Sequence, residues 1–583
     1  MKKNVLALSI AAMIGGLGFA GAASAAIIPG NGGATYDGSL MTPANASGLE
    51  FSEGGVGHQL LVPYYTVQDG NMTVIHLVNT DTNNGKAVKV RFRGASNSDD
   101  VLDFQVFLSP QDVWTAAVTA GSDGTAQIVT ADNTCTVPRL NPGVPQSFVT
   151  TRLNPNSDKA EQTREGYVEI FNIADIPKVE NNKFFQIANP GTTNTVTKAY
   201  SQLYTLTKHK NGVAPCSAGG AEWTALEKIA ITDFTGKEVD AANVGFNTPT
   251  GGLYGDWYII NVPKTTTFSG AATALRATTA TGVARGNFVH FPQDDGAVTN
   301  VDPFSADPLF RTDALNVDKS AFGTTPALSA GNYDLPDFST PYLAATAYTG
   351  GTLGNTSPLE QAAKLTDALA VKSVTNQYAT DASISAKTDW VFSLPTRRYS
   401  VAANYAILAD ATNTQGYAHK SYRLFSDLTH FAARTWFYPK DGADAAATTV
   451  ATNTTVDANG NICVAVNGQT FYDREESTMT VTSGSVFSPA KPGAAAKFSL
   501  CGEVNVLAFK DAGVSVLGAS DKIARQTASS SILYTNGWGV LDTTNGGAGL
   551  PILGASFIKL TNPSAGTGFS GTYGITWPHR YTK

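Results

Sequence analysis

Segments in which apolar and polar residues alternate are the feature that most restricts the fold of this chain. Residues 88–93 (Val-Lys-Val-Arg-Phe-Arg) alternate apolar and basic side chains, and residues 103–107 (Asp-Phe-Gln-Val-Phe) alternate polar and apolar ones. This period of two is typical of half-buried β-strands, because successive side chains point to opposite faces of a sheet. We therefore predict a mainly β fold of antiparallel β-sandwich domains, with one or two short helices.

A further strand is predicted just before these segments. Residues 73–78 form an apolar run, and residues 80–85 (Thr-Asp-Thr-Asn-Asn-Gly) follow as a turn into the next strand. The Asn84-Gly85 pair can supply the positive φ angles that a tight hairpin needs. Residues from about 58 to 120 are therefore expected to form an antiparallel sheet of a sandwich, with Trp114 in or near its core.

Two segments carry helix signals. Residues 357–360 (Ser-Pro-Leu-Glu) combine an N-cap, a proline at the first helical position and a glutamate that can close a capping box. A mostly apolar face follows, which predicts a helix near residues 358–372. A second helix is predicted near Glu222 to Ala230.

The first 25 residues resemble a secretory signal peptide. Lys2 and Lys3 precede an apolar run from Val5 to Ala20, and residues 23–25 (Ala-Ser-Ala) form a small-residue cleavage site. An uncleaved anchor is the alternative, but the run is short for a bilayer span. No later segment approaches about 18 consecutive apolar residues, so no transmembrane span is expected after cleavage. The remainder is divided provisionally into a β-sandwich-rich region, 26–310, and a second β-rich region, 311–583.

Charge and composition narrow the range of partners. The 583 residues include 40 Lys and Arg against 47 Asp and Glu, a formal net charge of −7, and charged residues make up only 15%. No basic run is present, so nucleic acid is not an expected partner. The abundance of Thr, Ala, Gly and Asn and the scarcity of Met and Cys are typical of secreted surface-array proteins.

The four cysteines are Cys135, Cys216, Cys463 and Cys501. An even number in an exported chain suggests disulfides, and four cysteines allow three connectivities. We favour the pairs that are local in sequence, Cys135–Cys216 and Cys463–Cys501. A zinc site is not favoured because no two cysteines have Cys-x-x-Cys spacing.

No catalytic motif is found. None of the seven histidines lies in an His-Glu-x-x-His or His-x-His pattern, and the Gly-x-Ser-x-Gly elbow and the phosphate-binding loop are missing. Residues 488–491 (Ser-Pro-Ala-Lys) match Ser-x-x-Lys, but the prolines at 489 and 492 favour a loop. We therefore assign no catalytic residues and predict a protein that is not an enzyme. A pair of carboxylates from distant strands stays open as an alternative.

Calcium is the one cofactor that the sequence suggests. Asp457, Asn459 and Asn461 place oxygen ligands at alternate positions, although the glycine and glutamate of an EF-hand are missing. Plain β-turns explain the same residues and are the favoured interpretation.

Aromatic residues raise the possibility of carbohydrate binding. Trp257 and Trp390 are the candidate sugar-stacking residues, although aromatic residues in strands more often belong to the core. Residues 577–581 (Trp-Pro-His-Arg-Tyr) form the densest polar-aromatic cluster. This cluster would either dock a partner or close the last strand, and the latter is slightly favoured.

Several motifs together resemble a known family. They are residues 61–65 (Leu-Val-Pro-Tyr-Tyr), 255–261 (Gly-Asp-Trp-Tyr-Ile-Ile-Asn), 376–378 (Asn-Gln-Tyr), 388–397 (Thr-Asp-Trp-Val-Phe-Ser-Leu-Pro-Thr-Arg) and 573–580 (Tyr-Gly-Ile-Thr-Trp-Pro-His-Arg). The chain resembles secreted proteobacterial cell surface proteins that are described as surface-layer-like. The resemblance implies an envelope location, no known enzymatic activity and no established site residues. The three-fold module that grips cell-wall polymer in familiar surface-layer proteins is not seen.

The sequence therefore favours a structural protein that is exported to the cell surface or outer envelope of a Gram-negative bacterium. Self-association into a coat is the expected activity, since heterologous contacts between copies produce open lattices. Envelope polysaccharide is a further candidate partner. The alternatives are a secreted adhesin or glycan-binding module and, less favoured, a hydrolase of unrecognised type.

Overall fold

The first element of the computed structural model is β1 (Ala26–Ile28), and the predicted signal peptide lies outside the described residues. Sheets with antiparallel strands dominate, which confirms the predicted mainly β fold. The structure describes residues 26–96, 98–151, 153, 158–178, 201–234, 236–290, 292–293, 302–305, 333–334, 358–396, 402–404, 421–422, 454–456, 462–475, 478–481, 499–509, 515–520, 525–528, 534–544, 549–562, 564–569 and 571–583.

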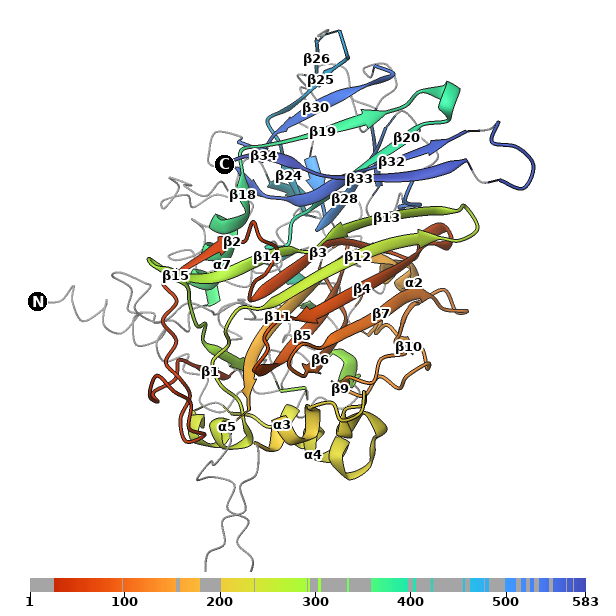
Figure 1. The fold of residues 1–583 in the computed structure, drawn as a ribbon. Coiled ribbons are helices and arrows are strands. Elements are labelled where there is room, and N and C mark those ends of the chain that lie inside the picture. Colours follow the sequence, from red (N-terminus) through yellow and green to blue (C-terminus); the bar gives the residue numbers. More distant parts are fainter. Residues whose placement is uncertain are drawn as a thin grey trace, which may run out of the picture.

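Two antiparallel sheets form the amino-terminal sandwich (Figure 1). The eight-stranded sheet has the order β15-β14-β3-β11-β5-β6-β9, with β2 also paired to β14, and the six-stranded sheet has the order β10-β8-β7-β4-β12-β13. The strands are β2 (Gly48–Phe51), β3 (Gln59–Thr66), β4 (Met72–Asn79), β5 (Asn84–Gly94), β6 (Asp100–Leu108), β7 (Val113–Ala120), β8 (Ala126–Val129), β9 (Cys135–Val137), β10 (Gln146–Ser147), β11 (Glu165–Pro177), β12 (Leu253–Asn261), β13 (Thr266–Ala271), β14 (Thr273–Thr279) and β15 (Gly282–Val283).

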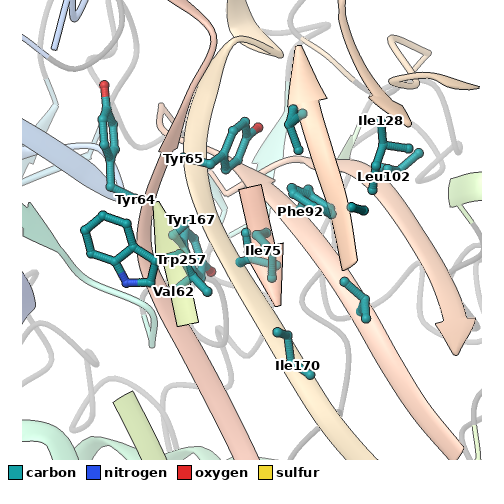
Figure 2. Close-up of a cluster of buried hydrophobic side chains, with 14 of the residues drawn as sticks. Val62, Tyr64, Tyr65, Ile75, Phe92, Leu102, Ile128, Tyr167, Ile170 and Trp257 are labelled. Carbon is teal, nitrogen blue, oxygen red and sulfur yellow. The ribbon is translucent and has the colours of Figure 1, made fainter. Parts of the chain in front are cut away.

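The hydrophobic core lies between these two sheets. Figure 2 shows Val62, Phe92 and Ile170 of the eight-stranded sheet near Ile75 and Trp257 of the six-stranded sheet. Trp114 is also fully buried here, as predicted. Burying a large apolar side chain stabilises a fold by about 1.5–3 kcal/mol, so this cluster is a main source of stability.

Strands β5, β6 and β11 of the eight-stranded sheet are buried on both faces, which corrects the prediction of half-buried strands. Three short helices, α3 (Gln202–Thr207), α4 (Gly220–Ala230) and α5 (Glu238–Val244), pack on the face opposite the core (Figure 1). Lys89 and Arg93 lie on this same face and are fully buried. Lys89 is paired with Asp103, and Arg93 Nε lies 3.4 Å from Glu169 Oε2. Because an unpaired buried charge is costly, these pairs allow basic residues to alternate inside the protein.

The segment between β4 and β5 is not the predicted tight hairpin. β4 pairs with β7 and β12, whereas β5 pairs with β6 and β11, so the segment crosses from one sheet to the other. Asn84 and Gly85 already belong to β5. Asp81 Oδ1 shapes the turn by accepting hydrogen bonds from the Asn83 and Asn84 amides, at 2.8 and 2.9 Å.

A second sandwich forms from the carboxyl-terminal part of the chain. Its outer five-stranded sheet has the order β26-β25-β30-β19-β34, and its inner five-stranded sheet has the order β29-β28-β20-β32-β33. The strands are β19 (Ser373–Ala379), β20 (Lys387–Ser393), β25 (Gly468–Tyr472), β26 (Thr478–Val481), β28 (Val504–Phe509), β29 (Arg525–Ala528), β30 (Asn536–Asp542), β32 (Leu553–Thr561), β33 (Thr572–Pro578) and β34 (Arg580–Thr582).

One hydrophobic core connects the two sandwiches. Val391 and Phe557 of the inner five-stranded sheet belong to the same cluster as the amino-terminal core. The Phe557 ring lies 5.9 Å from Trp257 and 5.4 Å from Phe268, measured between ring centroids. The two predicted regions, 26–310 and 311–583, are therefore packed together through a shared core.

The two predicted helices are present. α4 spans Gly220–Ala230, and α7 spans Pro358–Leu369 before the chain enters β18 (Ala370–Val371), which pairs with β31 (Leu550–Pro551). α2 (Lys159–Gln162), α3 and α5 were not predicted, because helices this short carry little periodic signal. The remaining small sheets are β1 with β16 (Phe288–His290), β17 (Tyr333–Asp334) with β21 (Ala402–Asn404) and β22 (Ser421–Tyr422), and β23 (Thr454–Val456) with β24 (Ile462–Ala465) and β27 (Ser499–Cys501).

Candidate functional site

Exposed aromatic side chains of the described residues are confined to the carboxyl-terminal sandwich. They are Trp538 on β30, Phe569 in the turn between β32 and β33, Tyr573 and Trp577 on β33, and Tyr581 on β34. Exposed apolar surface of this kind, when it is contiguous, commonly marks an interaction site.

The most prominent of these side chains belong to the β32–β33 hairpin. β33 is the last strand of the inner five-stranded sheet, and the turn of the hairpin reaches the right-hand edge of the molecule in Figure 1. The register pairs Ile558 with Ile575, and Ser556 with Trp577. β33 is therefore the last strand of its sheet and lies beside β13 of the amino-terminal sandwich (Figure 1).

The two faces of β33 have different environments. Gly574 and Thr576 face β13: a Cβ atom on Gly574 would lie 2.2 Å from the carbonyl oxygen of Thr267, so only glycine fits there. On the opposite face, Tyr573 is 62% exposed, Trp577 is 44% exposed and Ile575 is half-buried between them. We call Tyr573, Ile575 and Trp577 the β33 stripe.

The chain turns a corner directly after the β33 stripe. Pro578 ends β33, and Arg580 begins β34 in the outer five-stranded sheet, so His579 lies where the chain changes sheets. The His579 ring contacts both sheets, because Nδ1 lies 2.9 Å from Asn376 Nδ2 on β19 and Nε2 lies 2.8 Å from the Val391 oxygen on β20. Burial lowers the pKa of His579 to about 4, so its ring is neutral at pH 7.

The polar-aromatic cluster at residues 577–581 thus has two parts. His579, its middle residue, closes the corner between β33 and β34, which is the interpretation favoured from the sequence. Trp577 and Tyr581 are nevertheless exposed, which leaves the other interpretation, a partner-binding surface, available.

Trp257 and Trp390, the sugar-binding candidates, are both inside the protein. They are 2% and 1% exposed, respectively. Trp257 Nε1 donates to the Ala271 oxygen at 3.3 Å, and Trp390 Nε1 donates to the Gln377 oxygen at 2.8 Å. Neither ring is available to stack on a sugar, because strand alternation turns both toward packed sheets.

Trp538 forms a separate aromatic feature on the outer five-stranded sheet. Its ring is stacked on Tyr472 of the neighbouring strand, with centroids 4.1 Å apart and an interplanar angle of 13°. Because each ring covers one face of the other, the pair offers less free aromatic surface than the β33 stripe does.

A buried carboxyl group lies where the two sandwiches meet. Glu165 accepts hydrogen bonds from the Tyr64 hydroxyl at 2.8 Å and from the Ser520 amide at 2.9 Å. Burial raises the pKa of Glu165 to about 7. These two hydrogen bonds connect Glu165 on β11 with β3 and with the segment 515–520.

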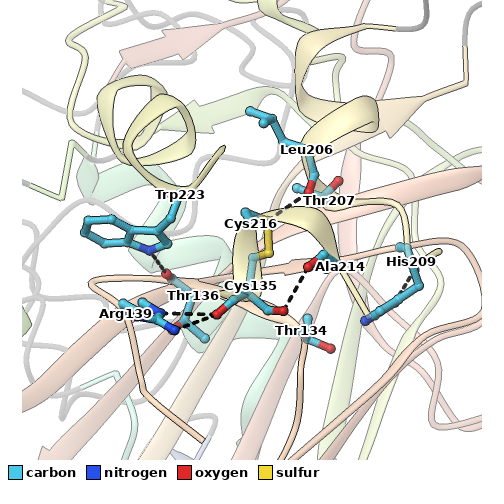
Figure 3. Close-up of a disulfide and its surroundings, with 12 residues drawn as sticks. Thr134, Cys135, Thr136, Arg139, Leu206, Thr207, His209, Ala214, Cys216 and Trp223 are labelled. Carbon is cyan, nitrogen blue, oxygen red and sulfur yellow. Dashed lines mark hydrogen bonds between the residues drawn. A yellow bond between two sulfur atoms is a disulfide. The ribbon is translucent and has the colours of Figure 1, made fainter. Parts of the chain in front are cut away.

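The first predicted disulfide is present. Cys135 on β9 is bonded to Cys216 in η2 (Pro215–Ala218), with Cα atoms 5.8 Å apart. Figure 3 shows the bond between β9 and the helical layer, with Trp223 Nε1 donating to the Thr136 oxygen beside it at 3.0 Å. A disulfide points to an oxidising, extracytoplasmic compartment.

The second predicted pair, Cys463–Cys501, is compatible with the strand register. Cys463 on β24 is directly opposite Cys501 on β27, and Cys501 is disulfide-bonded. Opposite residues of antiparallel strands are close enough for a disulfide. The Cys463–Cys501 pairing stays a prediction, which this register supports.

The predicted calcium loop, with Asp457, Asn459 and Asn461, lies outside the described residues. Within the described part of the chain, no group of three or more His, Cys, Asp or Glu side chains is arranged to hold a metal ion.

The same part contains no helix with the length and apolar character of a membrane span.

Comparisons with known proteins identify no relative. No family model, no curated protein and no solved structure matches this chain.

Tyr573 and Ile575 were not singled out as site residues from the sequence. Residues 572–578 (Thr-Tyr-Gly-Ile-Thr-Trp-Pro) alternate small with large apolar residues, which predicts that Tyr573, Ile575 and Trp577 share one face. Such a face is normally buried, so only the position of β33 at the margin of its sheet reveals the exposure.

Proposed function

We propose that this protein is a structural component of the bacterial cell surface that associates laterally with copies of itself. The observation that carries the proposal is the β33 stripe, an exposed apolar strip on the last strand of a sheet. Aromatic side chains are the usual anchors of protein interfaces, because a rigid ring buries much area at a small entropy cost. Contacts between this strip and a different surface of a second copy would generate an open array.

The shared hydrophobic core and the disulfide of the protein suit a structural role. The two sandwiches share one core, and the Cys135–Cys216 bond fastens the helical layer to the eight-stranded sheet. These features favour a durable protein in an oxidising space. We place it on the outer envelope of a Gram-negative bacterium, from the predicted signal peptide and the family resemblance.

A glycan-binding adhesin is the second candidate. Trp577 presents a partly free ring at the margin of a sheet, and such rings can stack on sugars as well as on a neighbouring protein. The two proposals differ in their consequence, because only self-association produces particles larger than the monomer in the purified protein.

Negative-stain electron microscopy of the purified mature protein tests the proposal, with and without millimolar calcium. Ordered sheets or filaments would support a structural role, and their loss without calcium would add a metal requirement. Dispersed monomers under both conditions would count against self-association and make a glycan array the next experiment.

A further inference from the structure

A cavity of about 580 Å³ opens at the end of the amino-terminal sandwich, away from the β33 stripe. It is lined by Ala34, Thr42, Pro43 and Asn45 of the amino-terminal segment and by Thr250, Ala284 and Arg285. Its volume falls within the range of about 300–1,000 Å³ that is usual for small-molecule sites.

The walls of the cavity are fixed by hydrogen bonds between segments that are distant in sequence. The Arg285 amide donates to Asn45 Oδ1 at 2.8 Å, and the Asn45 amide donates to the Arg285 oxygen at 3.1 Å. Thr248 Oγ1 donates to the Thr42 oxygen at 2.6 Å. The cavity is therefore formed before any ligand enters, which lowers the entropy cost of binding.

Arg285 supplies the charged group of the cavity. Its Nη1 donates to the Thr248 oxygen at 2.6 Å and lies 3.5 Å from Asp175 Oδ2, and its side chain is 26% exposed. Among the described residues, its Nε and Nη2 atoms have no hydrogen-bond partner. The guanidinium is thus held at one nitrogen while two donors stay available.

The nearby carboxylate, Asp175, is shared between Arg285 and a lysine. Asp175 is paired first with Lys86, whose Nζ lies 2.6 Å from Oδ1, and both side chains are fully buried. Asp175 also accepts hydrogen bonds from the amide and the hydroxyl of Thr250, at 3.1 and 2.8 Å. Lys86 also lies 3.4 Å from Asp81, so these four side chains carry two charges of each sign. The attraction of Arg285 for an added anion therefore depends on its two unbonded nitrogens rather than on an excess of positive charge.

The residues that line the cavity indicate which class of ligand it can bind. Among the described residues, Arg285 is the only charged one that lines the cavity, so an anion is favoured over a cation. The planar guanidinium matches a carboxylate, which can accept two parallel hydrogen bonds. The apolar surfaces of Ala34 and Pro43 and the carboxamide of Asn45 suit a ring that carries both C–H faces and hydroxyl groups.

We infer that this cavity binds the carboxylate of an acidic sugar, with Arg285 as the anion-binding residue. Such a site would attach the protein to an acidic surface polysaccharide. The inference does not depend on the β33 stripe, and a monomer that failed to assemble would still bind the sugar.

Isothermal titration of the mature protein with glucuronate tests the inference, with glucose, acetate and inorganic phosphate as comparison ligands. Glucuronate is expected to bind and glucose is not. Arg285→Gln should weaken glucuronate binding by about ten- to hundred-fold, the usual effect of losing a charge-assisted hydrogen-bonding group. Arg276→Gln is the matched control, because Arg276 is exposed, pairs with Glu50 and lies outside the cavity.

A second variant separates loss of binding from loss of folding. Ala34→Trp fills the exposed rim of the cavity and leaves Arg285 in place, so it should abolish binding while the unfolding temperature stays unchanged. No binding of glucuronate to the wild type, equal binding to Arg285→Gln, or equal binding of acetate or inorganic phosphate would overturn the assignment.

Discussion

Asn376 and His579 are hydrogen-bonded at the corner where the chain passes from one sheet of the carboxyl-terminal sandwich to the other, with 2.9 Å between Nδ2 and Nδ1. The Asn376 amide donates, so His579 Nε2 carries the ring proton and donates to the Val391 oxygen. The His579 ring is also stacked on Phe392, with centroids 5.1 Å apart. One neutral imidazole therefore fixes the strand that leads directly out of the β33 stripe.

Replacing His579 by phenylalanine keeps the ring contact with Phe392 but removes both hydrogen bonds. The Asn376 amide and the Val391 carbonyl then lose a buried partner, which costs about 2–4 kcal/mol of unfolding free energy. Urea denaturation measures this change. Arg580→Gln, on the exposed neighbour, is the control and should change stability by no more than about 0.5 kcal/mol. An equal loss of unfolding free energy for the two substitutions would contradict a stabilising role of the His579 hydrogen bonds.

Mild acid is expected to destabilise the protein through its buried histidines. Burial lowers the pKa of His579 to about 4 and the pKa of both His58 and His290 to about 3. Below pH 6.5 the unfolded chain takes up protons at these rings and the folded protein does not, so stability falls as the pH falls toward 4. At pH 5 each ring contributes a loss of about 2 kcal/mol.

Denaturation curves at pH 7.5 and pH 5 measure this loss, and the His579→Phe variant should show a smaller difference between the two. An identical pH dependence in variant and wild type would show that His579 does not titrate as described.

Glu165 is expected to act in the opposite direction. Its pKa is raised to about 7 by burial, so the folded protein keeps the carboxyl proton that the unfolded chain releases above about pH 4.5. Stability is therefore lost as the pH rises from 4.5 to 7. Glu165→Gln should stabilise the protein by about 2–3 kcal/mol at pH 8 and have little effect at pH 4.5. Thermal unfolding at the two pH values tests this, and destabilisation at pH 8 would contradict it.

The Cys135–Cys216 bond should make a large contribution to stability. It joins residues that are 81 positions apart, and closing a loop of this length stabilises a protein by about 4–5 kcal/mol on the chain-entropy model. We expect the Cys135→Ser/Cys216→Ser double variant to lose about this amount in urea denaturation. Peptide mapping without reduction should recover Cys135–Cys216 and Cys463–Cys501 as the two bridges. A peptide that links Cys135 to Cys463 would contradict both assignments.

Local patterns in the sequence predicted the positions of strands more reliably than they predicted which faces of those strands are buried. The alternation at residues 88–93 and 103–107 lies within β5 and β6, as predicted, because period two is a property of the strand itself. The same alternation did not reveal that Lys89 is buried against Asp103, because that depends on what covers the second face.

The sequence predicted only part of the candidate site, because the exposure of a side chain depends on what covers its face of the sheet. Trp257, Trp390 and Trp577 all lie within strands, yet the first two are buried and the third is exposed. The order of strands within a sheet decides between these outcomes, and it is set by pairings across hundreds of residues. The disulfide at Cys135 was predictable because four cysteines leave few alternatives.

Sedimentation velocity of the mature protein tests the central proposal most directly, using the wild type, the Tyr573→Ser/Trp577→Ser double variant, and a Val113→Ser control that removes an exposed apolar side chain elsewhere. The account predicts concentration-dependent assemblies for the wild type and the control, and a monomer of unchanged stability for the double variant. A monomeric wild type, or assemblies that persist without the two aromatic side chains, would contradict self-association through the β33 stripe.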